Sequence, residues 1–272
     1  PATPAPAPPE PPPEPPPEPL RDFAPLAATL AADLARVGAL LNAYRASAAR
    51  GDILPNALEA LRIELTYHSN AIEGNTLSLR ETQLVLEGLT PPGGKRLREV
   101  YEARNHDAAL RVVEGWARER PATQALTERD VLDLHAIVLK DIDDAHAGRF
   151  RAQHVLIAGS RFVPPGAHRF DELLPALLAL SAREHVHPLL RAAELHYNLV
   201  AVHPFADGNG RTARLLMNLA VLRAGGPLTV VEVERRAEYL DALEAANAGA
   251  LEPVARFVLG CVERSARRVL GE

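Results

Sequence analysis

The amino-acid sequence predicts a mainly α-helical protein in which helices surround one buried central helix, together with a single small β-hairpin. The composition is 47% hydrophobic but only 4% aromatic, and the common apolar residues Leu and Ala are good helix formers. Apolar residues recur at intervals of three and four along most of the chain, which is the helical period. The run RTARLLMNLAVL, from Arg211, is apolar on every side, as in a helix that others enclose.

Residues 1–19 read PATPAPAPPEPPPEPPPEP and contain no large apolar side chain. Such a Pro-rich segment is expected to be an extended or disordered tether. It is interpreted as a spacer rather than as a ligand for a proline-recognising domain, because no basic residues flank its PPE repeats. The rest of the chain is expected to divide into an N-terminal helical region, 20–115, and a core, 116–272.

Two amphipathic helices are expected in the N-terminal region. Apolar residues recur at helical spacing from Leu26 to Tyr44, and the segment 51–55 then interrupts the pattern. The second helix begins at about Asn56 and ends near Gly74, because Gly-Asn is a common helix C-terminus.

Further helices are expected in the remaining sequence. One runs from Leu97 to Trp116, and the next begins at a capping box of Thr127 and Asp130. His135 and His196 are interpreted as core residues, because the histidines lack the compact spacing of metal ligands. The last helices are expected immediately before His203, from Val230 to about Ala246, and through Val254 to Val262.

The apolar period changes between residues 141 and 170. Val155–Ile157 and Arg161–Val163 are short β-prone runs, and Gly159-Ser160 suits a two-residue turn between them. The sequence therefore predicts one β-hairpin over 155–164. It must pack on the helices, because an isolated hairpin is only marginally stable.

The segment His203–Arg214, HPFADGNGRTAR, combines several kinds of chemistry in twelve residues. The histidine offers a base that works near neutral pH. Asp207 offers a hard oxygen ligand. The turn 208–210 is small and flexible enough for its backbone N–H groups to approach an anion.

Arg211 and Arg214 stand three residues apart at the start of the predicted central helix and share one face of it. A buried guanidinium requires an anionic partner, because an unpaired buried charge is very costly. A helix N-terminus disfavours cations and itself attracts anions. The two arginines therefore indicate an anion site, most naturally for a polyphosphate.

This segment resembles the signature of the Fic family, HPFx(D/E)GNGRxxR, and every fixed position matches. Members of that family mostly transfer AMP from ATP to a hydroxyl group on a protein. The resemblance implies a Fic-like helical fold with its catalytic core at 116–272. It assigns the general base to His203 and Mg²⁺ to Asp207. It assigns phosphate binding to the turn and the arginines, namely Gly208, Asn209, Gly210, Arg211 and Arg214.

The segment Ser69–Asn75, SNAIEGN, resembles the inhibitory motif of the same family, (S/T)xxxE(G/N). Ser69 and Glu73 share a helix face, and Glu73 lies in the last turn, where the helix dipole disfavours a carboxylate. The resemblance implies that Glu73 pairs with Arg214 and obstructs the seating of the ATP γ-phosphate. The alternative is an exposed carboxylate at a frayed helix end.

The hairpin at 155–164 resembles the flap of Fic proteins, which lies beside the active site. Backbone groups of such a flap would hold an extended segment of a target protein by strand addition. A surface hairpin without this role is the alternative. By analogy with aromatic residues near the nucleotide in the family, Tyr239 would flank the base.

Charge and composition exclude other classes of protein. The formal net charge of −5 leaves no overall nucleic-acid footprint. The single cysteine, Cys261, excludes an internal disulfide and suits a reducing compartment. No apolar run reaches the ~20 residues of a membrane helix, and no signal peptide is evident. A cytoplasmic location is expected, and the family resemblance allows a homodimer.

Several functions stay open at this stage. Relatives also transfer phosphate, UMP or phosphocholine, but the Doc-type kinases carry Lys at the position of Gly210, so the glycine favours AMP transfer. Removal of AMP from a modified protein is a second possibility, in which Glu73 would position a water. A non-catalytic nucleotide-binding regulator is disfavoured by the complete signature, and a metal hydrolase by the spacing of the histidines.

Overall fold

A computed structural model describes residues 20–91 and 93–272 of the chain. The tether expected at 1–19 lies outside these residues. The α-helices are α1 (Leu26–Thr29), α2 (Ala31–Arg50), α3 (Pro55–Ile72), α4 (Leu79–Leu86), α5 (Leu97–Glu119), α6 (Glu128–Leu139), α7 (Phe170–Ala179), α8 (Pro188–Val202), α9 (Asn209–Arg223), α10 (Arg236–Asn247) and α11 (Glu252–Leu270). The short 3₁₀ helices are η1 (Ala167–Arg169), η2 (Leu180–Ala182) and η3 (Val233–Arg235).

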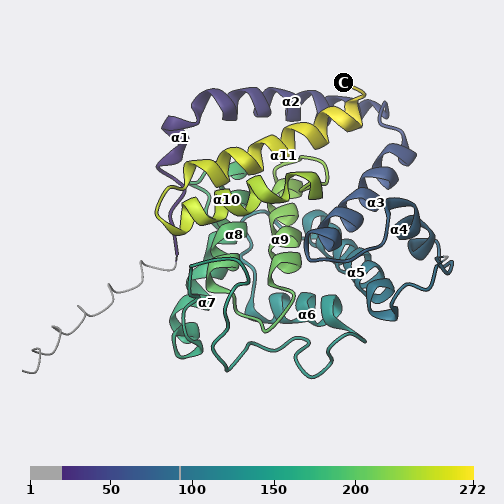
Figure 1. The fold of residues 1–272 in the computed structure, drawn as a ribbon. Helices are drawn as coiled ribbons and strands as arrows, with labels where there is room; N and C mark the ends of the chain where they lie inside the picture. Colours follow the sequence, from purple (N-terminus) through teal and green to yellow (C-terminus); the bar gives the residue numbers. More distant parts are fainter. Residues whose placement is uncertain (1–19, 92) are drawn as a thin grey trace, which may run out of the picture.

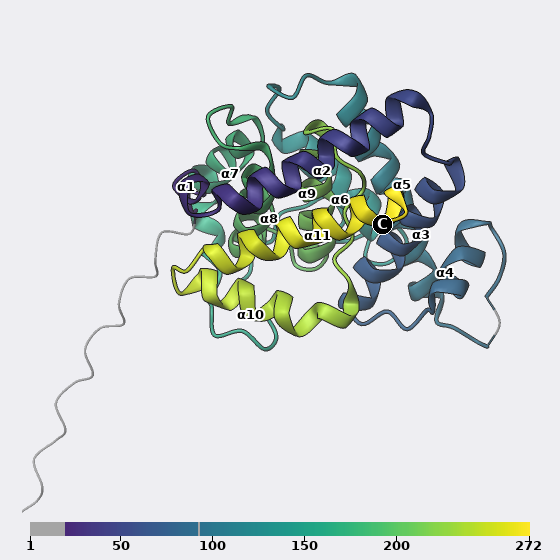
Figure 2. The same cartoon turned by 90° about the horizontal axis from the view of Figure 1, so that it is seen from above.

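Helix α9 runs through the middle of the molecule, between α8 on one side and α5 on the other (Figure 1). Every side chain of α9 from Arg211 to Val221 is buried. Helices α2 and α11 lie side by side across one end of the molecule, and α10 packs against α11 (Figure 2). The prediction of a mainly helical fold around a buried central helix is therefore confirmed.

Opposite faces of α9 join two hydrophobic cores. Met217 and Val221 belong to a core that also contains side chains from α2, α8, α10 and α11. Leu215 and Leu219 belong to a second core, made largely with α5, α6 and α7. Because both cores close on α9, the start of this helix is held firmly in the middle of the fold.

Most predicted helix boundaries agree with the structure, with one error near the C-terminus. The predicted capping box of Thr127 and Asp130 begins α6. The helix expected from Val230 begins only at α10. The preceding backbone is extended, because Thr229 donates its N–H to Asn218 Oδ1 at 2.7 Å and Val230 donates to Ser265 Oγ at 3.0 Å. These buried polar partners override the local helical pattern.

The predicted β-hairpin is wrong as a strand pair, since no strand occurs within residues 20–91 and 93–272. The chain does turn there, one residue earlier than predicted: Ser160 N–H donates to Ile157 O at 3.1 Å, and Gly159 has a φ of 80°. The two β-prone runs do not pair, because the turn instead packs toward α10, where the Ser160 hydroxyl contacts the Glu244 carboxylate. Residues 155–164 are called the flap segment below.

Two other features bear on the sequence predictions. None of the helices in the described ranges is both long and apolar enough to cross a bilayer. The thiol of Cys261 is buried between α-helices, and burial raises its pKa to about 12. Such a thiol is inert at neutral pH.

Candidate active site

The signature segment forms the connection between α8 and α9. Helix α8 ends in His203, which adopts a left-handed conformation with φ 50° and ψ 56°. A non-glycine residue is strained in this region, and such strain is concentrated at functional sites. Phe205 then enters the core and stacks on His135, with ring centroids 3.6 Å apart. Gly208, with φ 79°, turns the chain into α9.

The side chain of Asn209 closes this connection. Its amide nitrogen donates to Phe205 O at 2.8 Å, and its amide oxygen accepts from Phe205 N–H at 2.9 Å. The side chain that was expected to bind phosphate is therefore engaged with backbone. What Asn209 presents at the start of α9 is its own N–H, one of the first-turn donors without a carbonyl partner inside the helix.

His203 is placed as a neutral base. Its Nδ1 lies 3.1 Å from Val200 O, and a carbonyl can only accept, so Nδ1 carries the proton and Nε2 carries the lone pair. Burial lowers the pKa of His203, and the nearby Arg151 guanidinium lowers it further. The imidazole is therefore ready to take a proton at neutral pH.

Asp207 is held by two arginines. Its Oδ1 accepts from Gly208 N–H at 2.6 Å and from Arg211 at 3.2 Å, and its Oδ2 accepts from Arg98 of α5 at 2.9 Å. Burial alone would raise the pKa of this carboxyl group, but Arg211, the Gly208 N–H and Arg98 outweigh burial and lower it. Asp207 is therefore ionised.

At the N-terminus of α9, Arg211 donates to Asp207 through NH2, but its other two nitrogens have no hydrogen-bond partner in the described residues. Arg211 is 2% exposed, and its Nε and NH1 atoms have no hydrogen-bond partner within the described ranges. The first backbone N–H groups of α9 project from its N-terminus, which is also the positive end of the helix dipole. Buried, unsatisfied cationic donors at a helix N-terminus indicate an anion site.

Arg214, 1% exposed, is bonded to the end of α3 through two of its three guanidinium nitrogens. Its Nε donates to Ser69 Oγ at 3.0 Å, and its NH2 donates to Ser69 O and to Glu73 Oε1, each at 2.7 Å. Glu73 is the C-terminal cap of α3 and lies against Gly210, where an added Cβ would overlap the Glu73 carboxylate. The structure thus brings together Ser69, Glu73, Gly210 and Arg214.

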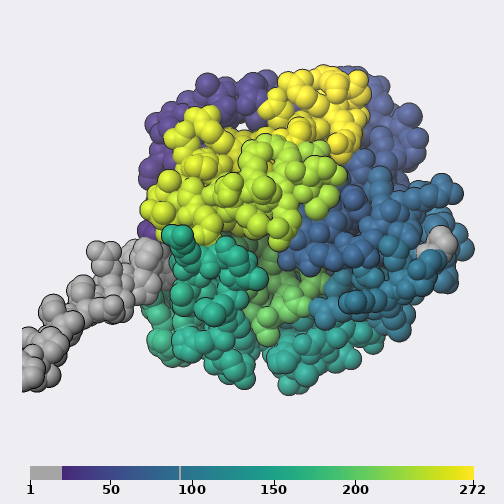
Figure 3. Space-filling model, viewed as in Figure 1, coloured from purple at the N-terminus to yellow at the C-terminus, as the bar shows by residue number. Residues whose placement is uncertain are grey.

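A cavity of about 450 Å³ opens beside these groups and is called the central cavity below. Its lining includes the polar side chains of Glu73, His203 and Arg214 and the apolar side chains of Leu240 and Leu243 from α10. Figure 3 shows green atoms from the middle of the sequence at the surface between teal, yellow-green and blue parts of the chain. The lining of the central cavity therefore combines charged and apolar side chains.

Tyr239 lines the central cavity beside Arg214, but its ring is buried in the core against Phe257. Its hydroxyl lies 3.0 Å from Nε2 of His196, which is itself completely buried. The structural interpretation of His196 agrees with this geometry.

Comparison with known proteins identifies the family. A family description, Fic/DOC family, matches residues 125–221. The solved structure of Fic-1 (residues 134–508) from C. elegans has a TM-score of 0.77 and 35% identity to this chain, covering 90% of this chain and 73% of that one. The chain belongs to the Fic/DOC family. The signature match therefore indicated the correct family.

Other Fic proteins show the same likeness at lower identity or over part of their length. A Fic family protein from Desulfovibrio desulfuricans has a TM-score of 0.73 and 28% identity, covering 91% of this chain and 74% of that one. The protein adenylyltransferase Fic of Culex quinquefasciatus is 37% identical over 215 residues, which are 78% of this chain and 42% of the relative. Protein adenylyltransferase fic-1 of Caenorhabditis elegans is 42% identical over 209 residues, 75% of this chain and 40% of the relative. The chain spans less than half the length of these curated relatives.

Sequence reasoning missed the residues that support the Fic signature. Buried Arg151 donates to the carbonyls of His203 at 2.7 Å and Pro165 at 2.6 Å, and so connects the end of the flap segment to His203. The C-terminus of α8, which is the negative end of the helix dipole, stabilises the positive charge of Arg151. His135 bonds Asp207 O at 2.9 Å and accepts from Gly148 N–H at 3.1 Å. The run Gly148-Arg149-Phe150-Arg151, directly before the flap segment, was the available sequence signal for Arg151.

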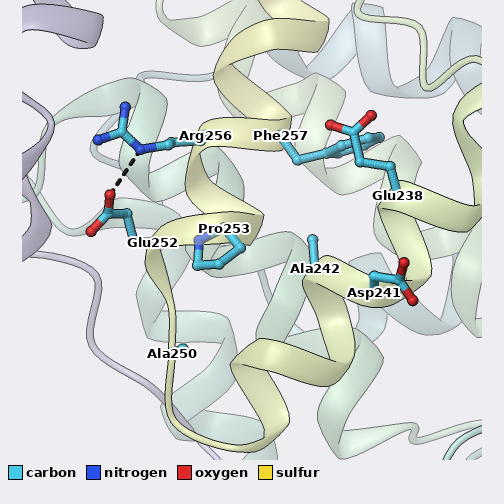
Figure 4. A pocket seen from close by; sticks show the side chains of 8 residues that line it. All are labelled: Glu238, Asp241, Ala242, Ala250, Glu252, Pro253, Arg256 and Phe257. Atoms are coloured by element: carbon cyan, nitrogen blue, oxygen red, sulfur yellow. Dashed lines mark hydrogen bonds and ion pairs between the residues drawn. The ribbon is translucent and has the colours of Figure 1, made fainter.

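A larger hollow of about 630 Å³ lies between α10 and α11, away from the Fic signature (Figure 4). Its lining includes Glu238, Asp241 and Phe257, and an ion pair of 2.8 Å joins Glu252 to Arg256 at its rim. None of the predicted site residues lines it. The central cavity is therefore the candidate active site.

Proposed function

We propose that this chain is a protein adenylyltransferase, which moves AMP from ATP to the hydroxyl of a Ser, Thr or Tyr side chain on a target protein. The observation that carries the proposal is the convergence of His203, the N-terminus of α9 and Arg214 on the central cavity. Relatives named protein adenylyltransferase support it.

The nucleotide would lie in the central cavity with its phosphates beside Gly210 and Arg214 and its base beside Leu240 and Leu243. The backbone N–H groups of residues 209–211 and the unsatisfied donors of Arg211 would hold phosphate oxygens. Gly210 allows the close approach, since a side chain there would fill the space. The base would pack on Leu240 and Leu243, with Tyr239 supporting that wall from the core.

In the chemical step, the target hydroxyl oxygen attacks the α-phosphorus of ATP. His203 Nε2 takes the hydroxyl proton, the new O–P bond forms, and the bond from the α-phosphorus to the bridging oxygen breaks to release pyrophosphate. The α9 N–H groups stabilise charge that develops on the α-phosphate oxygens, and Arg211 and Arg214 hold the leaving pyrophosphate.

Magnesium fits this site only together with the nucleotide. Within the described ranges, no group of three or more His, Cys, Asp or Glu side chains is placed to hold a metal. One ionised carboxylate, Asp207, stands beside the phosphate donors. Mg²⁺ is commonly bound by one or two carboxylates and by substrate phosphates, so Asp207 would hold the ion and the ion would neutralise phosphate charge.

The flap segment would bind the target protein. Leu156 and Ile157 line the central cavity from the flap side, close to His203. Their backbone is not paired with a strand in the described residues, so it is available for strand addition to an extended target segment. The hairpin would then be completed by the partner. Residues 116–272 would form the catalytic core and 20–115 the region that carries the inhibitory helix.

The described structure corresponds to the inhibited state of this proposal. Glu73 occupies Arg214, which would otherwise bind the γ-phosphate. Arg214 needs an anion in both states, so Glu73 also neutralises a buried charge when ATP is absent.

Labelling with α-³²P-ATP and Mg²⁺ tests the proposal. We expect Glu73→Gly to raise self-labelling at least about tenfold, and the double variant with His203→Ala to lose ~10²–10⁴ of that rate while still binding ATP. Glu73→Gly should also lower the melting temperature without ATP, because Arg214 loses its partner.

Full labelling by the His203→Ala double variant would refute the role of His203. Mass spectrometry that shows added phosphate instead of AMP would refute the reaction.

Removal of AMP from a modified protein is a second candidate, favoured by one observation. Glu73 lines the same cavity as His203 and uses Oε1 for Arg214, so the carboxylate stands where it could orient a water. An AMP-modified target incubated with wild type and with Glu73→Gly distinguishes the two directions. Loss of AMP with wild type alone would favour the reverse reaction.

A further inference from the structure

Arg98 occupies the one oxygen of Asp207 that a metal ion could reach. Oδ1 of Asp207 is engaged by the Gly208 N–H at 2.6 Å and by Arg211 at 3.2 Å. Both partners belong to the same short segment, and Arg211 is buried. Oδ2 has a single partner, NH2 of Arg98 at 2.9 Å, which reaches across from α5. A divalent cation that binds Oδ2 of Asp207 would therefore compete with Arg98 for this oxygen.

The position of Arg98 on α5 indicates that it is held there by these contacts. Arg98 is the second residue of α5, where the helix dipole disfavours a cation. Two carboxylates compensate: Asp207, and Glu102 of the next turn, which accepts from Arg98 Nε at 3.0 Å. Glu102 also lies 3.8 Å from NH1 of Arg211. Arg98 thus shares both of its carboxylate partners with the arginine at the anion site.

The ion pair between Arg98 and Asp207 can be replaced by another cation at little cost in stability. The side chains are 55% and 44% exposed, and exposed ion pairs contribute little to stability. The Glu73–Arg214 pair differs, because its guanidinium is buried. A hollow of about 480 Å³ lies next to Arg98, lined also by Glu73, Arg96 and Glu99, so the released guanidinium has both space and carboxylates to receive it.

We propose that Arg98 is an internal substitute for the divalent cation: it neutralises Asp207 in the nucleotide-free protein and must leave Oδ2 when Mg²⁺ arrives with the nucleotide. Arg98 is then a second restraint on the active site, separate from Glu73. Glu73 occupies the phosphate-binding arginine, whereas Arg98 occupies the metal ligand. This inference rests on the proposed function, since it requires a nucleotide–metal complex to bind at Asp207.

The affinity for ADP, measured by titration calorimetry with saturating Mg²⁺ and again in EDTA, tests the inference without any turnover. We expect Arg98→Gln to tighten binding of Mg²⁺–ADP by about three- to fivefold, the range of an exposed ion pair, and to leave metal-free ADP binding unchanged or weaker. Arg96→Gln is the control: it removes the same charge from the same hollow, and Arg96 makes no ion pair with Asp207.

The other outcomes are decisive. Equal effects of Arg98→Gln with and without Mg²⁺, or an equal gain in Arg96→Gln, would show a general charge effect and overturn the inference. Asp207→Asn should remove the Mg²⁺ dependence of ADP binding in every background. If Asp207→Asn keeps the Mg²⁺ dependence, or if wild type binds no ADP, the metal site of the proposed function is wrong. If only the Arg98→Gln result fails, the proposed function stands and the role of Arg98 is wrong.

Discussion

The two walls of the central cavity are built in different ways. The signature wall, 203–214, is fixed by its own bonds: Asn209 clamps Phe205, Arg214 is bonded to Ser69, and the segment joins two helices that are buried almost throughout. The flap segment is exposed, with Leu156 82% accessible. Its β-prone runs have no strand to pair with in the described residues. One wall is complete in the folded chain, and the other would be completed by a partner.

Among the variants that compare the two walls, the largest effect is expected where the walls meet, at Arg151. The guanidinium of this buried residue donates to the carbonyls of His203, Gln153 and Pro165, so Arg151→Met removes the donor from three partly buried bonds. We expect the free energy of unfolding to fall by about 2–4 kcal/mol, the cost of breaking such a buried network. Self-labelling in the Glu73→Gly background should fall about tenfold or more, because a misplaced base loses orientation.

Chemical denaturation and initial labelling rates measure these two quantities. Arg149→Met, two residues earlier and on an exposed side chain, is the matched control and should change neither. Wild-type labelling by a folded Arg151→Met variant would mean that the signature wall holds His203 without help from the flap root.

A smaller and more selective effect is expected at the flap. Leu156→Asp places a charge on the exposed edge that would receive the target, so protein labelling should fall about tenfold through a weaker encounter with the target. The same variant should bind ADP within about twofold of wild type and change stability by no more than ~0.5 kcal/mol, as exposed sites do. Leu54→Asp, at a distant leucine that is 63% exposed, is the control. A parallel loss of ADP binding would place Leu156 in the nucleotide wall instead.

The same contrast explains what the sequence could predict. Long helices with a strong apolar period, the Thr127 cap and the dense signature all act through neighbours in the sequence, and these predictions agree with the structure. The Glu73–Arg214 contact became predictable only through the resemblance, because 141 residues separate the partners. Arg98 and Asp207 are 109 residues apart in the sequence, and no local sequence pattern predicts that they form a pair.

The failed predictions have the same physical cause. Extended backbone at 229–230 depends on Asn218 and Ser265, which only the tertiary fold supplies. The hairpin prediction failed because two short β-prone runs gain too little from each other to pair in water. The bonds of the Asn209 side chain to Phe205 likewise could not be read from the local sequence, and phosphate binding at Asn209 stays a prediction. Local sequence therefore predicted elements well and cross-chain polar contacts poorly.

The smallest expected effect concerns pH, and it tests whether the signature wall is complete before the target binds. A base must be unprotonated, and burial holds the pKa of His203 below its usual 6.5. Labelling by Glu73→Gly should therefore be constant from pH 7 to 8 and fall by less than about threefold between pH 7 and 6, then about tenfold per unit at lower pH. Circular dichroism over the same range controls for unfolding.

The pH profile of kcat/KM reports the pKa in the free protein, and the pH profile of kcat reports the pKa in the complex with substrate. If His203 is fixed in advance, the two profiles should bend at the same pH. A rate that still rises from pH 7 to 8 would contradict the lowered pKa, and a displaced kcat profile would mean that the flap and its partner help to set the base.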